Sequence, residues 1–387
     1  MMKMLKPENE AALAEMIATG TGPLRIVGGG TRDIGALVQG DVLSMAEVSG
    51  ITLYEPGALT LVARAGTPVA DIEAALASEG QRLAFEPMDH RGLLGTQGTP
   101  TIGGIVAANV SGPRRIQVGA CRDSLLGVRF VDGIGRVLKN GGRVMKNVTG
   151  YDLVKLMAGS WGTLGVLSEV SLKVQAMPET EATLVCEGKT EQDGVAALCA
   201  ALGTPFDVAG AAHLDAAATG GMSRTQVRLE GLEASVAYRM DRLRQGLLAG
   251  FDVVQGAQSA LLWDEVRNVT PFADQTGAVW RISSKPTDGP LITAALKASG
   301  LAHRAIYDWG GGLVWVLVTQ DDTAGAAPIR QQVAKFGGHA TLVRASQVQR
   351  AQLDVFQKEP TPIAAITTSL RAQFDSHGRL NPGLMGE

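Results

Sequence analysis

Three consecutive glycines directly after a short apolar run constrain this chain most strongly. Residues 24–27 read as a β-strand, and Gly28, Gly29 and Gly30 follow at once. Glycine permits positive φ and close backbone approach, so the loop is either a tight turn or a nest of N–H groups that binds a phosphate. The stretch by itself leaves both interpretations open.

Two familiar phosphate-binding motifs do not fit this loop. The dinucleotide fingerprint of Rossmann folds would need a third glycine where Asp33 stands, and a P-loop would need a Gly-Lys-Ser/Thr sequence that does not follow. A nicotinamide-binding Rossmann enzyme is therefore disfavoured.

Length and charge limit the remaining classes. The 387 residues suffice for two or three domains. The net charge is −3 and no long Lys/Arg run occurs, which disfavours nucleic acid and an anionic membrane surface as partners. No apolar run approaches the roughly 18 residues of a membrane span. Three cysteines without metal-type spacing fit a reducing compartment. We therefore expect a cytoplasmic protein that reaches a membrane only through partners.

The pattern of the first 176 residues predicts strands and helices in a glycine-rich domain. Residues 8–19 have helical spacing and residues 59–66 read as a strand. A helix is expected after Thr67 as N-cap, with Pro68 at its first position and apolar Val69, Ile72 and Leu76 on its inner face. Two apolar runs around residues 132–135 predict a hairpin.

The sequence pattern changes near residues 177–178. From about 181 the chain again alternates strands and helices, which indicates a second α+β domain, and a short tail closes the chain.

Two further glycine-rich segments follow the first, and their order along the chain is more specific than any one of them. "TIGGIVAANVSG" (101–112) and "GTLGVLSEV" (162–170) follow "VGGGTRDIG" in a fixed order, and the tail holds "FDSHGRLNPG". This order resembles the FAD-binding domain of the vanillyl-alcohol oxidase family, also called PCMH-type. Within that family "MKNVTGYDLVKLMAGSWGTLG" is most similar to the smaller flavin subunits of bacterial glycolate oxidases, which are multi-subunit enzymes that oxidise glycolate to glyoxylate.

The resemblance implies a fold and a cofactor. The fold is α+β: a two-subdomain FAD-binding domain over residues 1–176, an α+β cap domain with an antiparallel sheet over 177–365, and a tail over 366–387 that returns to the first domain. The implied partners are a larger flavin subunit and an iron–sulfur subunit. Residues matching the cofactor segments of the family are Gly28, Gly29, Gly30, Thr31, Arg32, Asp33, Pro87, Thr101, Ile102, Gly103, Gly104, Asn109, Ser111, Gly165, Val166 and Asn381.

The catalytic residues are not evident from the sequence. Related 2-hydroxy-acid dehydrogenases hold a metal with His-x-Gly-Asp and Glu-His segments, and the five histidines here match neither, so no metal ligand is assigned. Four residues of the second domain are candidates for facing the flavin and the substrate: Arg281, Lys285, Tyr307 and Trp309. Surface charge and core packing are the competing explanations for these four. Cys121 and His90 are candidates for covalent attachment of the flavin; the competing explanations are a small buried residue for Cys121 and a loop position by the cofactor for His90.

The sequence is compatible with three functions. The chain is an FAD-binding subunit of a glycolate oxidase complex, a stand-alone flavin oxidase or dehydrogenase of another small alcohol or hydroxy acid, or a structural subunit that has lost its cofactor. The intact glycine loops favour retention of FAD.

Overall fold

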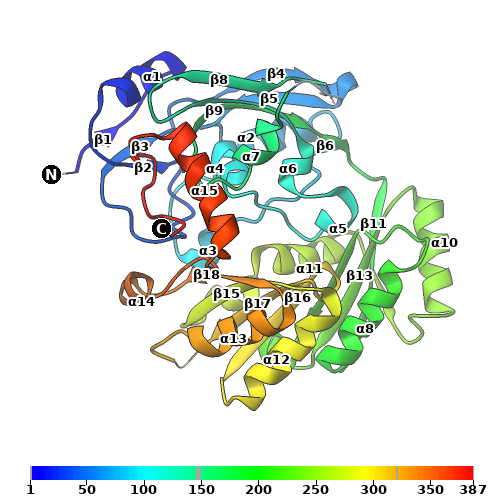
Figure 1. The fold of residues 1–387 in the computed structure, drawn as a ribbon. Coiled ribbons are helices and arrows are strands. Elements are labelled where there is room, and N and C mark those ends of the chain that lie inside the picture. Colours follow the sequence, from blue (N-terminus) through cyan, green and yellow to red (C-terminus); the bar gives the residue numbers. More distant parts are fainter. Residues whose placement is uncertain (1, 145–149, 320, 387) are drawn as a thin grey trace.

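The computed structural model describes residues 2–144, 150–319 and 321–386. Residues 145–149, at the start of the "MKNVTGYDL" motif, lie outside the described residues. Figure 1 shows two parts: an N-terminal part built from β1 to β10, and a large-sheet part built from β11 to β18.

The chain begins with a small three-stranded parallel sheet of order β1-β3-β2. Its strands are β1 (Met4–Leu5), β2 (Leu24–Val27) and β3 (Asp41–Ser44). Helix α1 (Glu10–Thr19) packs on it through the fully buried Leu13 and Ile17, as the helical spacing predicts. Its N-cap is Asn9, whose side chain accepts a hydrogen bond from the backbone N–H of Ala12.

A five-stranded antiparallel sheet of order β4-β5-β9-β7-β8 forms the rest of the N-terminal part. Its strands are β4 (Ile51–Glu55), β5 (Thr60–Arg64), β7 (Leu125–Val131), β8 (Val137–Gly141) and β9 (Val166–Lys173). The short elements beside it are η1 (Pro56–Ala58), α2 (Val69–Ala77), α3 (Arg91–Leu94), α4 (Ile102–Ala107), α5 (Arg115–Val118), α6 (Cys121–Ser124), α7 (Leu153–Met157) and the β6 (Gln81–Arg82) and β10 (Gln175–Ala176) pair.

The predicted β7–β8 hairpin is confirmed, and so is the buried face of α2. The predicted cap of α2 is wrong by one position. Pro68 is the N-cap, while the Thr67 hydroxyl bonds to Gly50 and Arg64 instead of to the helix.

The large-sheet part is one eight-stranded antiparallel sheet of order β14-β11-β13-β12-β16-β17-β15-β18. The strands are β11 (Thr180–Glu187), β12 (Gly210–Leu214), β13 (Arg224–Gly231), β14 (Asp252–Gln255), β15 (Ala278–Ser283), β16 (His303–Asp308), β17 (Leu313–Val318) and β18 (His339–Arg344). The predicted α+β class with an antiparallel sheet is confirmed.

Helices cover one face of this sheet, and the other face is turned to the N-terminal part and α11 (Figure 1). The connecting elements are α8 (Glu191–Leu202), α9 (Ala216–Thr219), α10 (Glu233–Arg244), α11 (Gly256–Asn268), η2 (Thr270–Phe272), η3 (Pro286–Asp288), α12 (Gly289–Ala298), η4 (Trp309–Gly311) and α13 (Ala326–Phe336).

After the large sheet the chain returns to the first sheet. Helices α14 (Gln347–Gln352) and α15 (Thr361–Phe374) lead to a tail beside β2, where the backbone N–H of Asn381 donates to the Leu24 carbonyl at 2.9 Å. Figure 1 shows α15 running across the N-terminal part to the C-terminus. Among the described residues, no helix is both long and apolar enough to cross a membrane.

Candidate functional site

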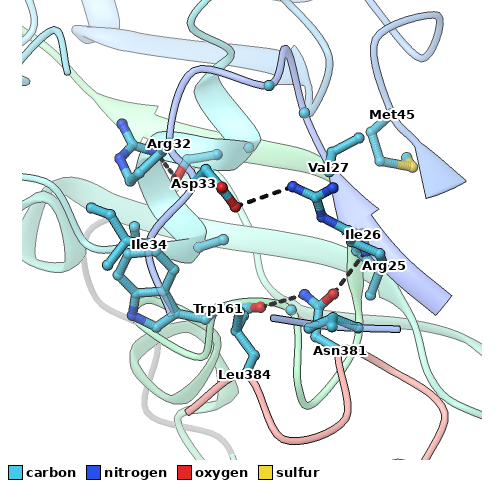
Figure 2. A pocket seen from close by; sticks show the side chains of 18 of the residues that line it. Arg25, Ile26, Val27, Arg32, Asp33, Ile34, Met45, Trp161, Asn381 and Leu384 are labelled. Carbon is cyan, nitrogen blue, oxygen red and sulfur yellow. Dashed lines mark hydrogen bonds and ion pairs between the residues drawn. The ribbon is translucent and has the colours of Figure 1, made fainter. Parts of the chain in front are cut away.

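A cavity of about 420 Å³ lies between the two sheets of the N-terminal part (Figure 2). Its size is in the range of small-molecule and cofactor sites. Its lining comes from β2 and the loop after it, from α4, from the start of β9 and from the tail. Four segments that are distant in sequence therefore meet at one hollow.

The glycines after β2 are required by close packing against a second loop. A Cβ on Gly28 would lie 2.3 Å from the Thr101 hydroxyl, and one on Gly29 would lie 1.6 Å from the carbonyl oxygen of Thr99. Gly30 has a φ of +73°. The loop can thus follow the cavity wall only without side chains at these positions.

The same loop presents unused donors. Within the described part of the chain, none of the backbone N–H groups of residues 28–33 donates a hydrogen bond to protein. Buried or cavity-facing N–H groups without an acceptor are costly, so a row of them suits an anion such as a diphosphate.

Two side chains beside the loop are also incompletely satisfied. Arg32 donates to the carbonyl of Gly104 at 2.9 Å, but its buried Nε has no acceptor among the described residues. The buried hydroxyl of Thr101 likewise has no partner there. Burial lowers the pKa of Arg32 to about 10, which still leaves the guanidinium charged at neutral pH. These groups add positive charge and donors to the cavity wall.

Asp33 is tied to two arginines at the rim of the cavity. Its carboxylate accepts from Arg25 of β2 at 3.1 Å, as Figure 2 shows, and from Arg350 of α14 at 2.7 Å. Hydrogen bonding to Arg350 is the main cause that lowers the pKa of Asp33, with burial opposing it. Arg350 also donates to the Gly35 carbonyl at 2.8 Å, so α14 clamps the loop. Nothing in the sequence marks Arg350 for this contact.

Asn381 joins the tail to the cavity. Its amide oxygen accepts from the backbone N–H of Ile26 at 2.8 Å, and its amide nitrogen donates to the carbonyl of Trp161 at 2.8 Å (Figure 2). The residue is buried and has a φ of +45°, which asparagine tolerates better than most residues.

Most of the sequence-predicted cofactor residues are brought together at this cavity. Those that line it are Gly28, Gly29, Gly30, Thr31, Arg32, Asp33, Thr101, Gly103, Gly104, Gly165, Val166 and Asn381. Pro87, Ile102, Asn109 and Ser111 are not among the lining residues.

Pro87 is buried away from the cavity, and the other three residues outside the lining support the surrounding structure. Ile102 is fully buried in the core, because it lies on the inner side of α4. Asn109 and Ser111 accept backbone hydrogen bonds from Arg122 and Cys121, which holds α6 in place. Burial raises the pKa of the Cys121 thiol, and like His90 it does not line the cavity.

The four candidate substrate residues separate into two groups. Tyr307 points into the helix-covered face of the large sheet, where its hydroxyl meets Thr293 at 2.6 Å, so it does not face the N-terminal part. Lys285 is exposed after β15. Arg281 and Trp309 lie together, with the guanidinium carbon 5.2 Å from the centroid of the indole ring. Among the described residues, no three His, Cys, Asp or Glu side chains gather as a metal site.

The chain is similar in sequence to known flavoproteins. The FAD binding domain family matches residues 3–141. Glycolate oxidase subunit GlcE of Escherichia coli (strain K12) is 36% identical over 365 residues, covering 94% of this chain and 92% of that protein. Glycolate oxidase subunit GlcD of Bacillus subtilis is 33% identical over 144 residues, or 37% of this chain and 27% of that one.

Solved structures share the fold at low sequence identity. The 4-ethylphenol oxidase of Gulosibacter chungangensis matches with a TM-score of 0.72 and 14% identity over 99% of this chain and 88% of that chain. An alkyldihydroxyacetonephosphate synthase matches with a TM-score of 0.69 and 16% identity over 98% and 76%.

Proposed function

Because this chain belongs to the family of FAD-dependent oxidoreductases that includes glycolate oxidase subunit GlcE, we propose that it is the FAD-binding subunit of a complex that oxidises glycolate to glyoxylate. The observation that carries the proposal is the near full-length match to GlcE combined with a cavity whose glycine loop offers a row of N–H donors to a ligand.

The residues at the cavity fit the cofactor. The N–H groups of residues 28–33 would hold the diphosphate, with Arg32 supplying positive charge and Gly104 bracing that guanidinium. Gly165 and Val166 offer backbone at the adenine end, and Asn381 fixes the tail against β2. Bound FAD would supply two-electron oxidation, while the protein supplies binding, orientation and electrostatics.

The implied partners are the larger flavin subunit and the iron–sulfur subunit of such an oxidase. GlcD and GlcE are both named as subunits of glycolate oxidase, which supports a multi-subunit assembly. The proposal places the complex in the cytoplasm, with any membrane association made by the partners.

The experiment that tests the function is a cofactor analysis of the purified chain. Its visible spectrum is recorded, the protein is denatured, and the released cofactor is identified. We expect flavin bands and free FAD. A colourless protein that also refuses added FAD would overturn the proposal in favour of a structural subunit.

A second step separates the enzyme hypotheses. Glycolate is added anaerobically to the FAD-loaded chain, with and without the two partner subunits. Bleaching that needs the partners supports a subunit role. Bleaching of the lone chain by another alcohol, but not by glycolate, supports a stand-alone oxidase.

A further inference from the structure

The face of the large sheet that is turned to the N-terminal part carries an arginine on β15, the strand beside the edge strand β18. In β15 the indole N–H of Trp280 bonds to the carbonyl of Ala324 beside α13, on the helix-covered face. Successive strand residues alternate between faces, so Arg281 points to the opposite face. Trp315, its register partner on β17, shares that face.

A second arginine approaches the same place from the N-terminal part. The guanidinium carbon of Arg115, on α5, lies 4.1 Å from the centroid of the Trp309 ring, and that of Arg281 lies 5.2 Å from it. One indole ring is therefore in cation–π contact with guanidinium groups from both parts of the molecule.

Neither arginine has an acidic partner in the described part of the chain. Across residues 2–144, 150–319 and 321–386, neither guanidinium donates a hydrogen bond or forms an ion pair within 4.0 Å. Burial is the main cause that lowers the pKa of Arg281 to about 10, and repulsion by Arg115 adds to it. Two like charges held together in a partly buried place favour binding of an anion.

Two acids act on the pair from a distance, Asp308 on Arg281 and Asp123 on Arg115. Asp308 precedes the tryptophan and its carboxylate accepts the backbone N–H of Trp309 at 2.7 Å. Burial raises the pKa of Asp308 to about 7, although Arg228 and Arg281 act against that rise. Asp123 is itself paired with Lys155 at 3.5 Å, so neither acid forms an ion pair with the two guanidinium groups.

The tryptophan that both arginines contact is held in a strained conformation. Trp309 has a φ of +53°, a rare value for a bulky residue, and Gly310 and Gly311 after it also have positive φ. Its indole N–H donates to the carbonyl of Gly112 at 3.0 Å, which fixes the ring against the N-terminal part. Backbone strain that the surroundings maintain is concentrated at functional sites.

We propose that Arg115 and Arg281, which both contact the ring of Trp309, form a binding site for the carboxylate group of a small organic acid. A guanidinium group matches a carboxylate in shape and can bind it through two parallel hydrogen bonds. The proposal rests on the proposed function for the identity of the acid and deepens it, because this chain would then bind an acid itself and not only pass electrons.

The test is a calorimetric titration of the FAD-loaded full-length chain with oxalate, which has no C–H bond to oxidise and so reports binding without turnover. We expect saturable binding, with Kd raised at least tenfold in both Arg281→Gln and Arg115→Gln. Lys297→Gln removes the same charge from an exposed position on α12, on the helix-covered face of the sheet, and should leave Kd unchanged. Equal Kd values in the wild type and both arginine variants, or no binding by the wild type, would overturn the site.

Two controls keep the outcome decisive. Arg281→Lys retains the charge and restores part of the affinity if the residue binds the anion, and circular dichroism shows whether each variant is folded. Sulfate that competes as strongly as oxalate would overturn the assignment to carboxylates. A chain that binds FAD but not oxalate refutes this site and leaves the proposed function intact. A chain that does not bind FAD refutes the proposed function. In that case oxalate is titrated into the FAD-free chain, so that the site is still tested.

Discussion

Arg228 of β13 donates two hydrogen bonds, both of 2.9 Å, to the carboxylate of Glu86 in the N-terminal part. Both side chains are buried, and Arg114 and Glu230 extend the pair across the boundary through a further hydrogen bond of 2.9 Å. The two parts of the molecule are thus joined by a compact group of charges, next to helix α5, which carries Arg115.

We predict that Glu86→Gln destabilises the protein by about 3–5 kcal/mol, because it leaves Arg228 buried without its full countercharge. The free energy of unfolding is measured by urea denaturation. Glu47→Gln is the matched control, since Glu47 pairs with Lys6 at the surface and its loss should cost less than about 1 kcal/mol. Similar losses in both variants would contradict a special role for the buried group.

Stability should also fall as the pH decreases from about 4.5 to about 2. Burial raises the pKa values of Glu86 and Glu230, but the surrounding arginines overcome it and hold both at about 2, below the ordinary 4.5. The folded state therefore binds fewer protons than the unfolded state in this window, and stability is lost as both groups protonate. Urea midpoints recorded across this range should fall more steeply in the wild type than in Glu86→Gln. Parallel curves would refute this.

The sequence predicts the local parts of the site better than its long-range contacts. The need for Gly28 and Gly29 follows from the strand-to-loop pattern, and the structure supplies the cause, which is the approach of residues 99–101. The alternation of side chains along a strand predicts that Trp280 and Arg281 lie on opposite faces of the sheet. It does not predict which face packs against helices and which is turned to the N-terminal part.

Contacts between distant segments had no signal in the sequence. Arg350 reaches Asp33 from 317 positions away, and the Arg228–Glu86 pair joins residues 142 positions apart. Arg115 was missed for the same reason, since its relation to Trp309 arises only when α5 packs against the large sheet. Tyr307 lies on the helix-covered face and not on the face expected of a substrate residue. An aromatic residue near a glycine turn carries no signal of the face of the sheet to which its side chain points.

Asn381→Ala should weaken both the fold and FAD binding. It removes the acceptor for the Ile26 N–H and the donor to the Trp161 carbonyl, and each unsatisfied buried group costs about 1–3 kcal/mol. Asn381→Asp keeps the acceptor but sets a buried carboxylate against the Trp161 carbonyl, so its stability should fall at least as far as that of Asn381→Ala. Ser376→Ala, at an exposed tail position, is the control. Urea denaturation and FAD titration check the order, and an unchanged FAD affinity in Asn381→Ala would contradict a role at the cavity.

Gly29→Ala tests whether the glycine loop serves the cofactor. The added methyl group would lie 1.6 Å from the Thr99 carbonyl oxygen, so the loop must move away from residues 99–101 and the row of N–H groups is displaced. Overpacking of this kind costs about 1–3 kcal/mol. Because the N–H groups act together on one anion, we expect the affinity for FAD to fall at least tenfold.

Gly22→Ala provides the comparison for this substitution. Gly22 lies just before β2, a methyl group added there would have no other atom within 4 Å, and its φ is not positive, so alanine should be accepted without loss of FAD. FAD binding is followed by the change in flavin fluorescence, and ADP competition reports the diphosphate end separately. A Gly29→Ala protein that binds both FAD and ADP like the wild type would show that the loop only turns the chain, whereas loss of both ligands with a retained fold indicates that its backbone holds the diphosphate.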